Sequence, residues 1–172
     1  LIIKDSGILA GVELAQKIFS IVDRSLKLKI YKHDGSLVKK GDIAFVVEGS
    51  ARSILTAERV VLNCMQRMSG VATQTNHLTG LCKPYKTKLL DTRKTSPLLR
   101  GLEKWAVRIG GGHNHRYGLY DMILIKNNHI DFAGGIRPAI ESANTYLKRK
   151  NLELKIEIEA RNLDEVKEVI LT

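Results

Sequence analysis

Apolar residues recur at helical spacing through the middle of the chain. Between residues 53 and 68 they occupy positions i, i+3, i+7, i+10, i+11 and i+14, which predicts an amphipathic helix. Arg59, Asn63 and Arg67 follow one another at intervals of four and fall on the opposite, polar face. A further helical segment is predicted from about Val71 to Leu81.

The chain up to about residue 50 has shorter apolar runs that are separated by turn signals. The runs LIIK, LKLKIYK and DIAFVVEG are typical of strands, and turns are expected at Asp34-Gly35 and Gly41-Asp42. One helical stretch, from Val12 to about Val22, lies among them. This region is therefore expected to form a small α+β unit.

After Lys83-Pro84 the pattern changes to alternating strands and helices. KLLD, MILIK and LKIEIE are expected to be strands, and LLRGLEKWAVRI and NLDEVKEVILT are expected to be helices. Such alternation is typical of parallel βα units. About ninety residues follow Lys83, whereas a closed (β/α) barrel needs roughly 200 or more. About half of such a barrel is expected here.

The helix expected from Leu98 to about Ile109 has clear end signals. Ser96-Pro97 is a favourable N-cap and first-turn pair, and Gly110-Gly111-Gly112 ends the helix. The three glycines lack the sequence context of a nucleotide-binding loop. An apolar stripe on this helix is interpreted as core packing and comprises Leu98, Leu102, Trp105 and Ile109.

Composition limits the class of protein. The 172 residues are 44% hydrophobic and 27% charged, which predicts a folded chain and excludes a disordered one. Twenty-eight Lys and Arg against eighteen Asp and Glu give a net charge of +10, so an anionic partner is expected. Only 5% of the residues are aromatic, which is few for a protein that stacks single-stranded bases on aromatic rings.

The cysteines and the short apolar runs indicate in which cellular compartment the protein is expected. Cys64 and Cys82 form neither a CxxC motif nor a cluster with histidine, so neither a disulfide framework nor a structural metal site is expected. No apolar run approaches the roughly 18 residues of a membrane helix, and no signal-peptide pattern occurs. A cytoplasmic protein without a membrane partner is predicted.

Because the chain begins with Leu1 and stops at Thr172 inside an amphipathic stretch, it is expected to be a piece of a longer protein.

Positive charge is concentrated between Lys88 and Ile130, where eight Lys and Arg face three acidic residues. Arg93 and Lys94 follow the predicted strand KLLD and precede the predicted helix. A strand's carboxyl end, two cations and a helix N-terminus together favour an anion-binding site. Lys126 ends MILIK in the same way, and His115-Arg116 adds an imidazole and a planar guanidinium. The alternative is a solvated basic loop.

The last predicted strand carries a possible acidic group for the same site. The alternation in LKIEIEA places Lys155, Glu157 and Glu159 on one face of the strand. The alternative interpretation is an ordinary half-exposed edge.

Three segments carry a resemblance to a known family: AERVVLNCMQRMSGVAT, DTRKTSPLLRGLEKWAVRIGGGHNHR and MILIKNNHI. In this combination, which is dense from about Ala57 to His129, the chain strongly resembles the quinolinate phosphoribosyltransferases. The resemblance implies an α/β fold with an N-terminal α/β sandwich domain, here residues 1–82. The first part of an α/β barrel of the type II phosphoribosyltransferases, here residues 83–172 and truncated, is expected to follow it.

The resemblance also implies an activity. Such an enzyme transfers the phosphoribosyl group of phosphoribosyl pyrophosphate to quinolinate with decarboxylation. The products are nicotinate mononucleotide, pyrophosphate and CO2, the reaction uses Mg²⁺, and it belongs to NAD biosynthesis. No protein-held metal site and no nucleic-acid partner are expected. This stretch alone is expected to be inactive, because the later strands, with an acidic residue and glycine-rich phosphate loops, are not in it.

Candidate site residues follow from the same resemblance. It implies that the two carboxylates of quinolinate are bound by Arg93, His115, Arg116 and Lys126. A dicarboxylate in a partly desolvated pocket needs several fixed cations, which agrees with the charge pattern.

Four further residues complete the implied site. Lys94 is expected to face phosphoribosyl pyrophosphate, and Glu159, rather than Glu157, is expected near the ribose and the reaction centre. Lys94 and Glu159 are the catalytic candidates, and Thr92 is a substrate-binding candidate. Arg59 corresponds to a family arginine that reaches into the neighbouring subunit's site, which implies a homodimer with shared active sites.

The sequence leaves two alternative functions open. A molybdenum-transport-associated relative shares the TRKT and GGGxxHR elements, although the ending Lys126-Asn127-Asn128-His129 fits the quinolinate enzymes better. A non-catalytic, basic nucleic-acid-binding fragment is the other. It predicts an affinity for nucleic acid that falls steeply with salt.

Overall fold

All 172 residues are described by the computed structural model, and they form two compact units, Leu1–His115 and Arg116–Thr172. The domain boundary predicted between residues 82 and 83 falls at the end of a long helix, inside the first of these units. The division into domains therefore stays a prediction. None of the helices combines the length and the apolar character that crossing a lipid bilayer requires.

Short strands of the first unit pair in two antiparallel ribbons. β1 (Gly7–Ile8) pairs with β3 (Leu37–Val38), and β2 (Lys27–Ile30) pairs with β4 (Phe45–Glu48). β2 and β4 confirm two of the expected strands. The run LIIK forms only an isolated bridge between Ile2 and Ile43.

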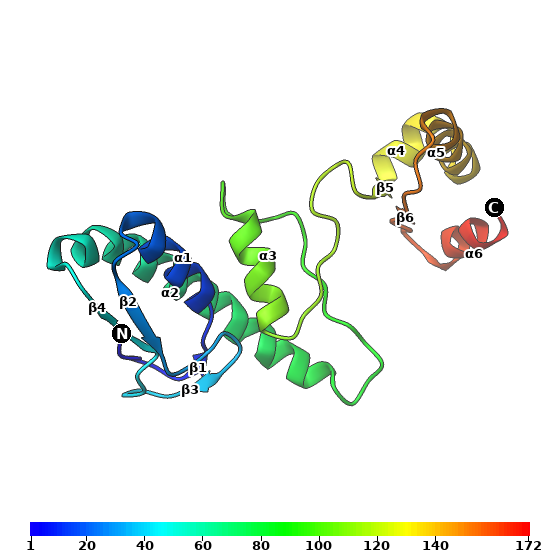
Figure 1. The fold of residues 1–172 in the computed structure, drawn as a ribbon. Helices are drawn as coiled ribbons and strands as arrows, with labels where there is room; N and C mark the ends of the chain where they lie inside the picture. The colour runs from blue at the N-terminus through cyan, green and yellow to red at the C-terminus, as the bar shows by residue number, and fades with distance from the viewer. The chain divides into compact units, whose positions relative to one another are not determined.

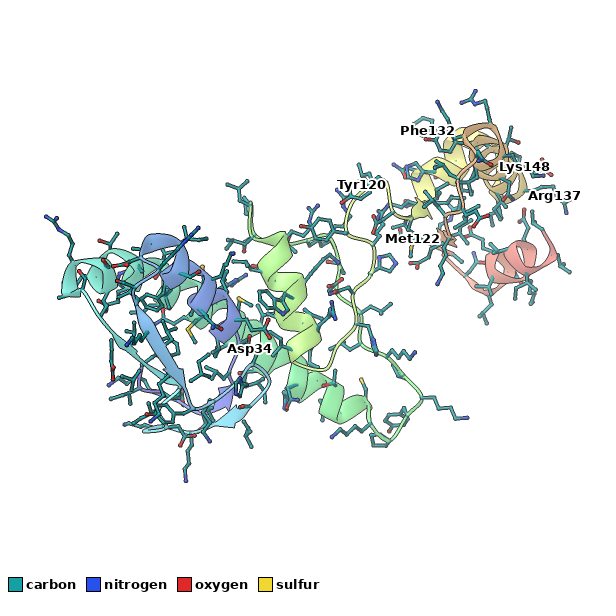
Figure 2. The ribbon with its side chains drawn as sticks, viewed as in Figure 1. Asp34, Tyr120, Met122, Phe132, Arg137 and Lys148 are labelled. Atoms are coloured by element: carbon teal, nitrogen blue, oxygen red, sulfur yellow. The ribbon has the colours of Figure 1, made fainter.

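The first helix, α1 (Val12–Val22), has the predicted bounds. Its N-cap residue is glycine and has no side chain to offer, so a residue from a distant turn takes that role. The carboxylate of Asp34, labelled in Figure 2, accepts hydrogen bonds from the backbone N–H groups of Val12 (2.8 Å) and Glu13 (3.3 Å). The predicted turn at Asp34-Gly35 is confirmed, with Gly35 at φ 85°.

A single helix, α2 (Ala51–Cys82), replaces the two helical segments that the sequence predicts. The helix continues through Gly70 because its buried side is uninterrupted there, with Met68 and Ala72 both fully buried. Packing of this face outweighs the roughly 1 kcal/mol that a glycine costs inside a helix. The predicted polar face is confirmed, since Arg59 and Arg67 are exposed.

Two clusters of buried side chains connect α2 to the rest of the first unit. In the first, Phe19 of α1 meets Phe45 of β4 edge to face, with ring centroids 6.2 Å apart. In the second, Met68 and Ala72 of α2 pack with Ala106 of the next helix. Figure 1 shows α1 and that helix, α3 (Arg100–Ile109), both lying along α2.

The start of α3 differs from the prediction. The helix begins at Arg100, its N-cap is Leu99 without a side-chain cap, and the preceding Leu98 lies in the left-handed region with φ 63°. The side chain of Leu98 is fully exposed, so it does not belong to the core stripe. The expected Ser96 cap is wrong because the Ser96 hydroxyl accepts a hydrogen bond from Arg67 instead. The other three stripe residues are confirmed, and they are Leu102, Trp105 and Ile109.

Glycines end α3 as predicted, with Gly110 as C-cap and Gly111 at φ 90°. The expected strand KLLD is reduced to one parallel bridge, between Leu90 and His113. This bridge brings the loop after Leu90 and the segment after the glycines side by side.

The second unit has the expected parallel βα pattern. Strand β5 (Ile123–Ile125) pairs in parallel with β6 (Ile156–Ile158), and Ile125 is opposite Ile158. Between the two strands run α4 (Asn127–Ala133) and α5 (Ile136–Lys150), and α6 (Leu163–Leu171) follows. Figure 1 shows these elements. Their small core is built from isoleucines and one alanine, namely Ile125, Ile130, Ile136 and Ala139.

Candidate active site

Candidate site residues occur in both compact units. The first unit contributes Arg59, Thr92, Arg93, Lys94 and His115, and the second contributes Arg116, Lys126 and Glu159.

Charged side chains of α3 hold the loop of residues 91–96 from one side. The Glu103 carboxylate accepts hydrogen bonds from the backbone N–H of Ser96 (3.1 Å) and from Nε of Arg67 (2.8 Å). One turn earlier, Nε of Arg100 donates to the Thr95 hydroxyl at 3.3 Å. The loop that carries the predicted cations is thus fixed by hydrogen bonds at several of its residues.

The environment of Glu103 favours its charged form. Burial by itself raises the pKa of this carboxyl, but hydrogen bonds from Arg67 and Ser96 outweigh burial and hold the pKa below its ordinary value. Arg67 thereby connects the predicted polar face of α2 with the loop, in a 2.6 Å ion pair to Glu103.

The three consecutive candidates on this loop differ in exposure. Thr92 and Lys94 are exposed, and the Thr92 hydroxyl accepts a hydrogen bond from the Lys94 N–H at 3.1 Å, which tightens the turn between them. Arg93 is partly buried, and its Nε atom is buried without a hydrogen-bond partner. Buried donors of this kind are rare because their desolvation is costly, so Arg93 is suited to receive an anionic acceptor.

A second set of polar groups, of which the side chains of Lys104 and Asp91 are buried, contacts the backbone of His115. Lys104 of α3 forms an ion pair with Asp91, and its Nζ also donates to the His115 carbonyl at 3.1 Å. Asp91 accepts the N–H of His115 at 2.9 Å and the amide of Asn114 at 2.5 Å. The loop at Asp91 and the segment at His115 are therefore tied to each other.

In the second unit, Lys126 and Glu159 lie directly after β5 and β6. Since the strands are parallel neighbours, these side chains meet at one edge of the pair, with Nζ of Lys126 3.1 Å from Oε1 of Glu159. The alternation predicted for the last strand is confirmed, because Lys155, Glu157 and Glu159 are exposed while the intervening isoleucines are partly buried.

Neighbouring groups order this edge further. The ring Nδ1 of His129 accepts a hydrogen bond from the Lys126 N–H at 2.9 Å and caps the start of α4. Arg161 pairs with Glu165 at 2.6 Å and with Asp131 at 3.1 Å. Hydrogen bonds from Arg161 lower the pKa of Glu165.

The sequence pattern did not indicate the polar residues that support the site. Lys104 was interpreted only as part of the positive window, and the following residues received no role: Asp91, Glu103 and Asn114. One signal was available, since Arg100, Glu103 and Lys104 stand at helical spacing i, i+3, i+4 and form a second face of α3.

No group of three or more His, Cys, Asp or Glu side chains is arranged to hold a metal ion. Mg²⁺ is bound in many enzymes through one or two carboxylates together with substrate phosphates, and single carboxylates such as Glu159 are present.

Two family models together match every residue of the chain except residue 70. Residues 71–172 match the family model described as quinolinate phosphoribosyl transferase, C-terminal domain, and residues 1–69 match the corresponding N-terminal domain. The two models meet at residue 70, inside α2.

Individual proteins agree with the family models. A chloroplastic nicotinate-nucleotide pyrophosphorylase (carboxylating) of Arabidopsis thaliana is 54% identical over 97% of this chain and 47% of its own length. A mitochondrial quinolinate phosphoribosyltransferase (decarboxylating) of Nicotiana tabacum is 50% identical over the same shares. This chain thus spans about half the length of the curated relatives it matches.

Solved structures support the same fold. The crystal structure of NadC from Streptococcus pyogenes superposes with a TM-score of 0.93 at 37% identity, over 99% of this chain and 59% of the other. The mixed α/β fold and the resemblance found in the sequence are confirmed.

Proposed function

Because the chain belongs to the quinolinate phosphoribosyltransferase family, we propose that the whole protein transfers the phosphoribosyl group of phosphoribosyl pyrophosphate to quinolinate. The products are nicotinate mononucleotide, pyrophosphate and CO2. The observation that carries the proposal is the buried Nε of Arg93, which has no partner in a loop that is otherwise held by hydrogen bonds. A carboxylate ligand offers such a donor the acceptor it lacks.

Quinolinate is a dianion, and the charges of the candidate residues match it. We assign its two carboxylates to Arg93, His115, Arg116 and Lys126. Each is a cation or a hydrogen-bond donor, and all four are only partly exposed. Partial burial strengthens charge-assisted hydrogen bonds, because less water competes for the ligand.

The remaining candidates suit phosphoribosyl pyrophosphate. The exposed ammonium of Lys94 and the hydroxyl of Thr92 are assigned to its phosphates, and the carboxylate of Glu159 is assigned to the ribose. In the proposed step, the pyridine nitrogen forms a bond to the anomeric carbon while the bond from that carbon to pyrophosphate breaks. Glu159 then faces positive charge that develops on the ribose.

Decarboxylation completes the reaction. The carboxylate next to the ring nitrogen leaves as CO2, its bonding electrons stay on the ring carbon, and that carbon takes up a proton. Mg²⁺ is assigned to the substrate, where it neutralises charge on the leaving pyrophosphate. The protein's contribution is mainly to position the reactants and to stabilise charge.

A homodimer with shared active sites is part of the proposal. Arg59 is exposed on α2, and none of the hydrogen bonds or ion pairs of the first unit that involve α2 uses its side chain. This geometry leaves its guanidinium available for the partner subunit's site.

The relatives differ in their cellular location. The two plant relatives are named as chloroplastic and mitochondrial. The cytoplasmic location expected from the sequence is retained as a proposal for this protein, and imaging of a tagged whole protein tests it.

The activity is tested by incubating the whole protein with phosphoribosyl pyrophosphate, Mg²⁺ and quinolinate that is labelled in the carboxyl group next to nitrogen. Equal amounts of labelled CO2 and nicotinate mononucleotide are expected. Nicotinate serves as the matched monocarboxylate control. Turnover of nicotinate but not quinolinate, or turnover of neither, contradicts the proposal.

A further inference from the structure

Helix α3 buries two consecutive charged residues, Glu103 and Lys104. Lys104 is only 3% exposed, and lysine is almost never buried to this degree unless it is paired. Its partner is the carboxylate of Asp91, which is also buried, with a side chain 8% exposed. The pair therefore lies in the interior of the first unit and links α3 to the start of the loop that carries Arg93.

The two atoms that form this ion pair, Nζ of Lys104 and Oδ1 of Asp91, both also bond to the backbone of His115. Oδ1 of Asp91 accepts the His115 N–H at 2.9 Å, and Nζ of Lys104 donates to the His115 carbonyl at 3.1 Å. Residue His115 is thus held at both its N–H and its carbonyl by a single ion pair. Asn114 completes the network, since its amide donates to Oδ2 of Asp91 (2.5 Å) and to the Lys104 carbonyl (2.8 Å).

Stability alone does not account for such a pair. Replacing a buried ion pair with apolar residues of similar volume is often neutral or stabilising, whereas removing one partner is strongly destabilising. What the ion pair provides, and apolar side chains cannot, is a directional link from α3 to the backbone of His115. The same link holds Asp91, which stands two residues before Arg93.

We propose that Lys104 is a positioning residue for the transfer reaction: acting through Asp91, it fixes the backbone from which the His115 imidazole projects. The inference rests on the proposed function, in which His115 contacts a quinolinate carboxylate. A catalytic or binding group that shifts by about 1 Å can lose a hundredfold in rate. Lys104 itself does not contact the substrate in this proposal.

The test compares Lys104→Met with the parent in the whole protein. Lys104→Met removes the donor to the His115 carbonyl and leaves Asp91 without its cation. We expect the KM for quinolinate to rise at least about tenfold, as for other losses of charge-assisted contacts. A purely structural role lowers the melting temperature and the active fraction, hence kcat, but leaves the KM of the folded molecules unchanged. Arg108→Met, an exposed arginine of the same helix, is the matched control and keeps the parental KM.

A second variant covers the case in which Lys104→Met fails to fold. The double substitution Asp91→Asn with Lys104→Gln removes both charges but keeps an acceptor for the His115 N–H and a donor for its carbonyl. We expect this variant to bring the quinolinate KM to within about threefold of the parent, even where it melts earlier. A KM that stays parental in folded Lys104→Met, or that remains raised in the double variant, overturns the proposal.

Amide hydrogen exchange separates this inference from the proposed function. The His115 amide is expected to exchange slowly in the parent and faster in Lys104→Met, in the presence or absence of substrate. If the parent does not turn over quinolinate, the proposed function fails. Exchange at His115 then still tests whether Lys104 and Asp91 hold the backbone of His115. Unchanged exchange at His115 overturns the inference whatever the activity.

Discussion

The ammonium group of Lys126 lies 3.1 Å from a carboxylate oxygen of Glu159, where the parallel strands β5 and β6 end side by side. Both side chains are about half exposed, at 45% and 50%. Ion pairs of this exposure contribute at most about 1 kcal/mol to stability. The pair therefore orients Lys126 but holds it only weakly. An incoming carboxylate can replace Glu159 as the partner of Lys126.

This exchange of partners predicts opposite effects of Glu159→Gln on binding and on turnover. Loss of the Glu159 charge releases Lys126, so the quinolinate dissociation constant is expected to fall by up to about fivefold, the equivalent of the pair's 1 kcal/mol. Turnover is expected to fall by about a hundredfold, because no carboxylate then faces the positive charge on the ribose. Titration calorimetry and steady-state kinetics on the whole protein measure the two effects.

Glu157→Gln is the matched control for this prediction. Glu157 is exposed on the same face of β6, two residues earlier, and its substitution is expected to leave turnover within about twofold of the parent. Equal losses in the two variants contradict the assignment of Glu159 to the reaction centre.

Arg116→Lys separates charge from geometry in the quinolinate site. The substitution keeps the positive charge and removes the planar fork that holds a carboxylate with two hydrogen bonds. A lost charge-assisted hydrogen bond costs about 1.5 to 3 kcal/mol, so the quinolinate dissociation constant is expected to rise at least about tenfold. The melting temperature is expected to stay nearly unchanged.

Arg137→Lys provides the control for Arg116→Lys. Arg137, labelled in Figure 2, is an exposed arginine of α5 in the same unit, and its substitution is expected to alter neither affinity nor melting. A parental affinity in Arg116→Lys excludes Arg116 as a carboxylate ligand. A large fall in its melting temperature assigns it a structural role instead.

Subunit mixing tests whether Arg59 acts across a dimer. In the whole protein, Arg59→Ala and Arg116→Ala are each expected to be nearly inactive. In a mixed dimer, one site receives both substitutions and the other receives neither, so random exchange is expected to restore about a quarter of the parental activity. Native mass spectrometry verifies the exchange. A mixture that stays as inactive as its parents means that Arg59 acts within its own chain.

Hydrophobic patterns over short stretches of the sequence predicted much of this fold. The stripe of apolar residues gave the position of α2, and the alternation in LKIEIE gave the exposed face of β6 with Glu159 on it. These signals succeed because each depends on residues that are close in the sequence and on a single buried face.

The support of the site could not be foreseen in this way. Glu103 and Lys104 look like solvated charges on an amphipathic helix, and they are buried only because Arg67 and Asp91, 36 and 13 residues away, provide opposite charges. Ser96 fails as a helix cap for the same reason, since Arg67 takes its hydroxyl. Tertiary partners overrode local preference at each of these positions.

Gly70 is expected to lower the stability of α2, and Gly70→Ala is expected to raise it. A Cβ at this position meets no atom within 4 Å, and alanine stabilises a helix interior by about 0.5 to 1 kcal/mol relative to glycine. Gly110→Ala is the contrasting variant, because a Cβ added at this position would collide with the carbonyl oxygen of Ala72. It is expected to destabilise the protein by about 1 to 3 kcal/mol. Chemical denaturation measures the free energy of unfolding of both variants. If Gly70→Ala is destabilising, the side of α2 at residue 70 is in contact with other atoms and the prediction is contradicted.

Glu103→Gln is expected to lower stability in a way that depends on pH. Hydrogen bonds from Arg67 and Ser96 outweigh burial and hold the pKa of Glu103 below its ordinary value. Since the folded pKa is depressed, the carboxylate stabilises the protein fully above the unfolded value of about 4.3. This contribution is lost as the pH falls through the folded pKa. At pH 7 the variant is expected to be less stable by at least about 1 kcal/mol.

The difference in melting temperature between Glu103→Gln and the parent is therefore expected to shrink as the pH is lowered from 5 to 2.5, in thermal denaturation followed by circular dichroism. Below the folded pKa the parent carries a neutral carboxyl at residue 103, which is close to glutamine in size and in hydrogen-bonding capacity. Glu58→Gln, at an exposed glutamate of α2, is the control and is expected to melt with the parent throughout. A difference that persists undiminished at pH 2.5 means that packing of the side chain, rather than its charge, is what residue 103 contributes.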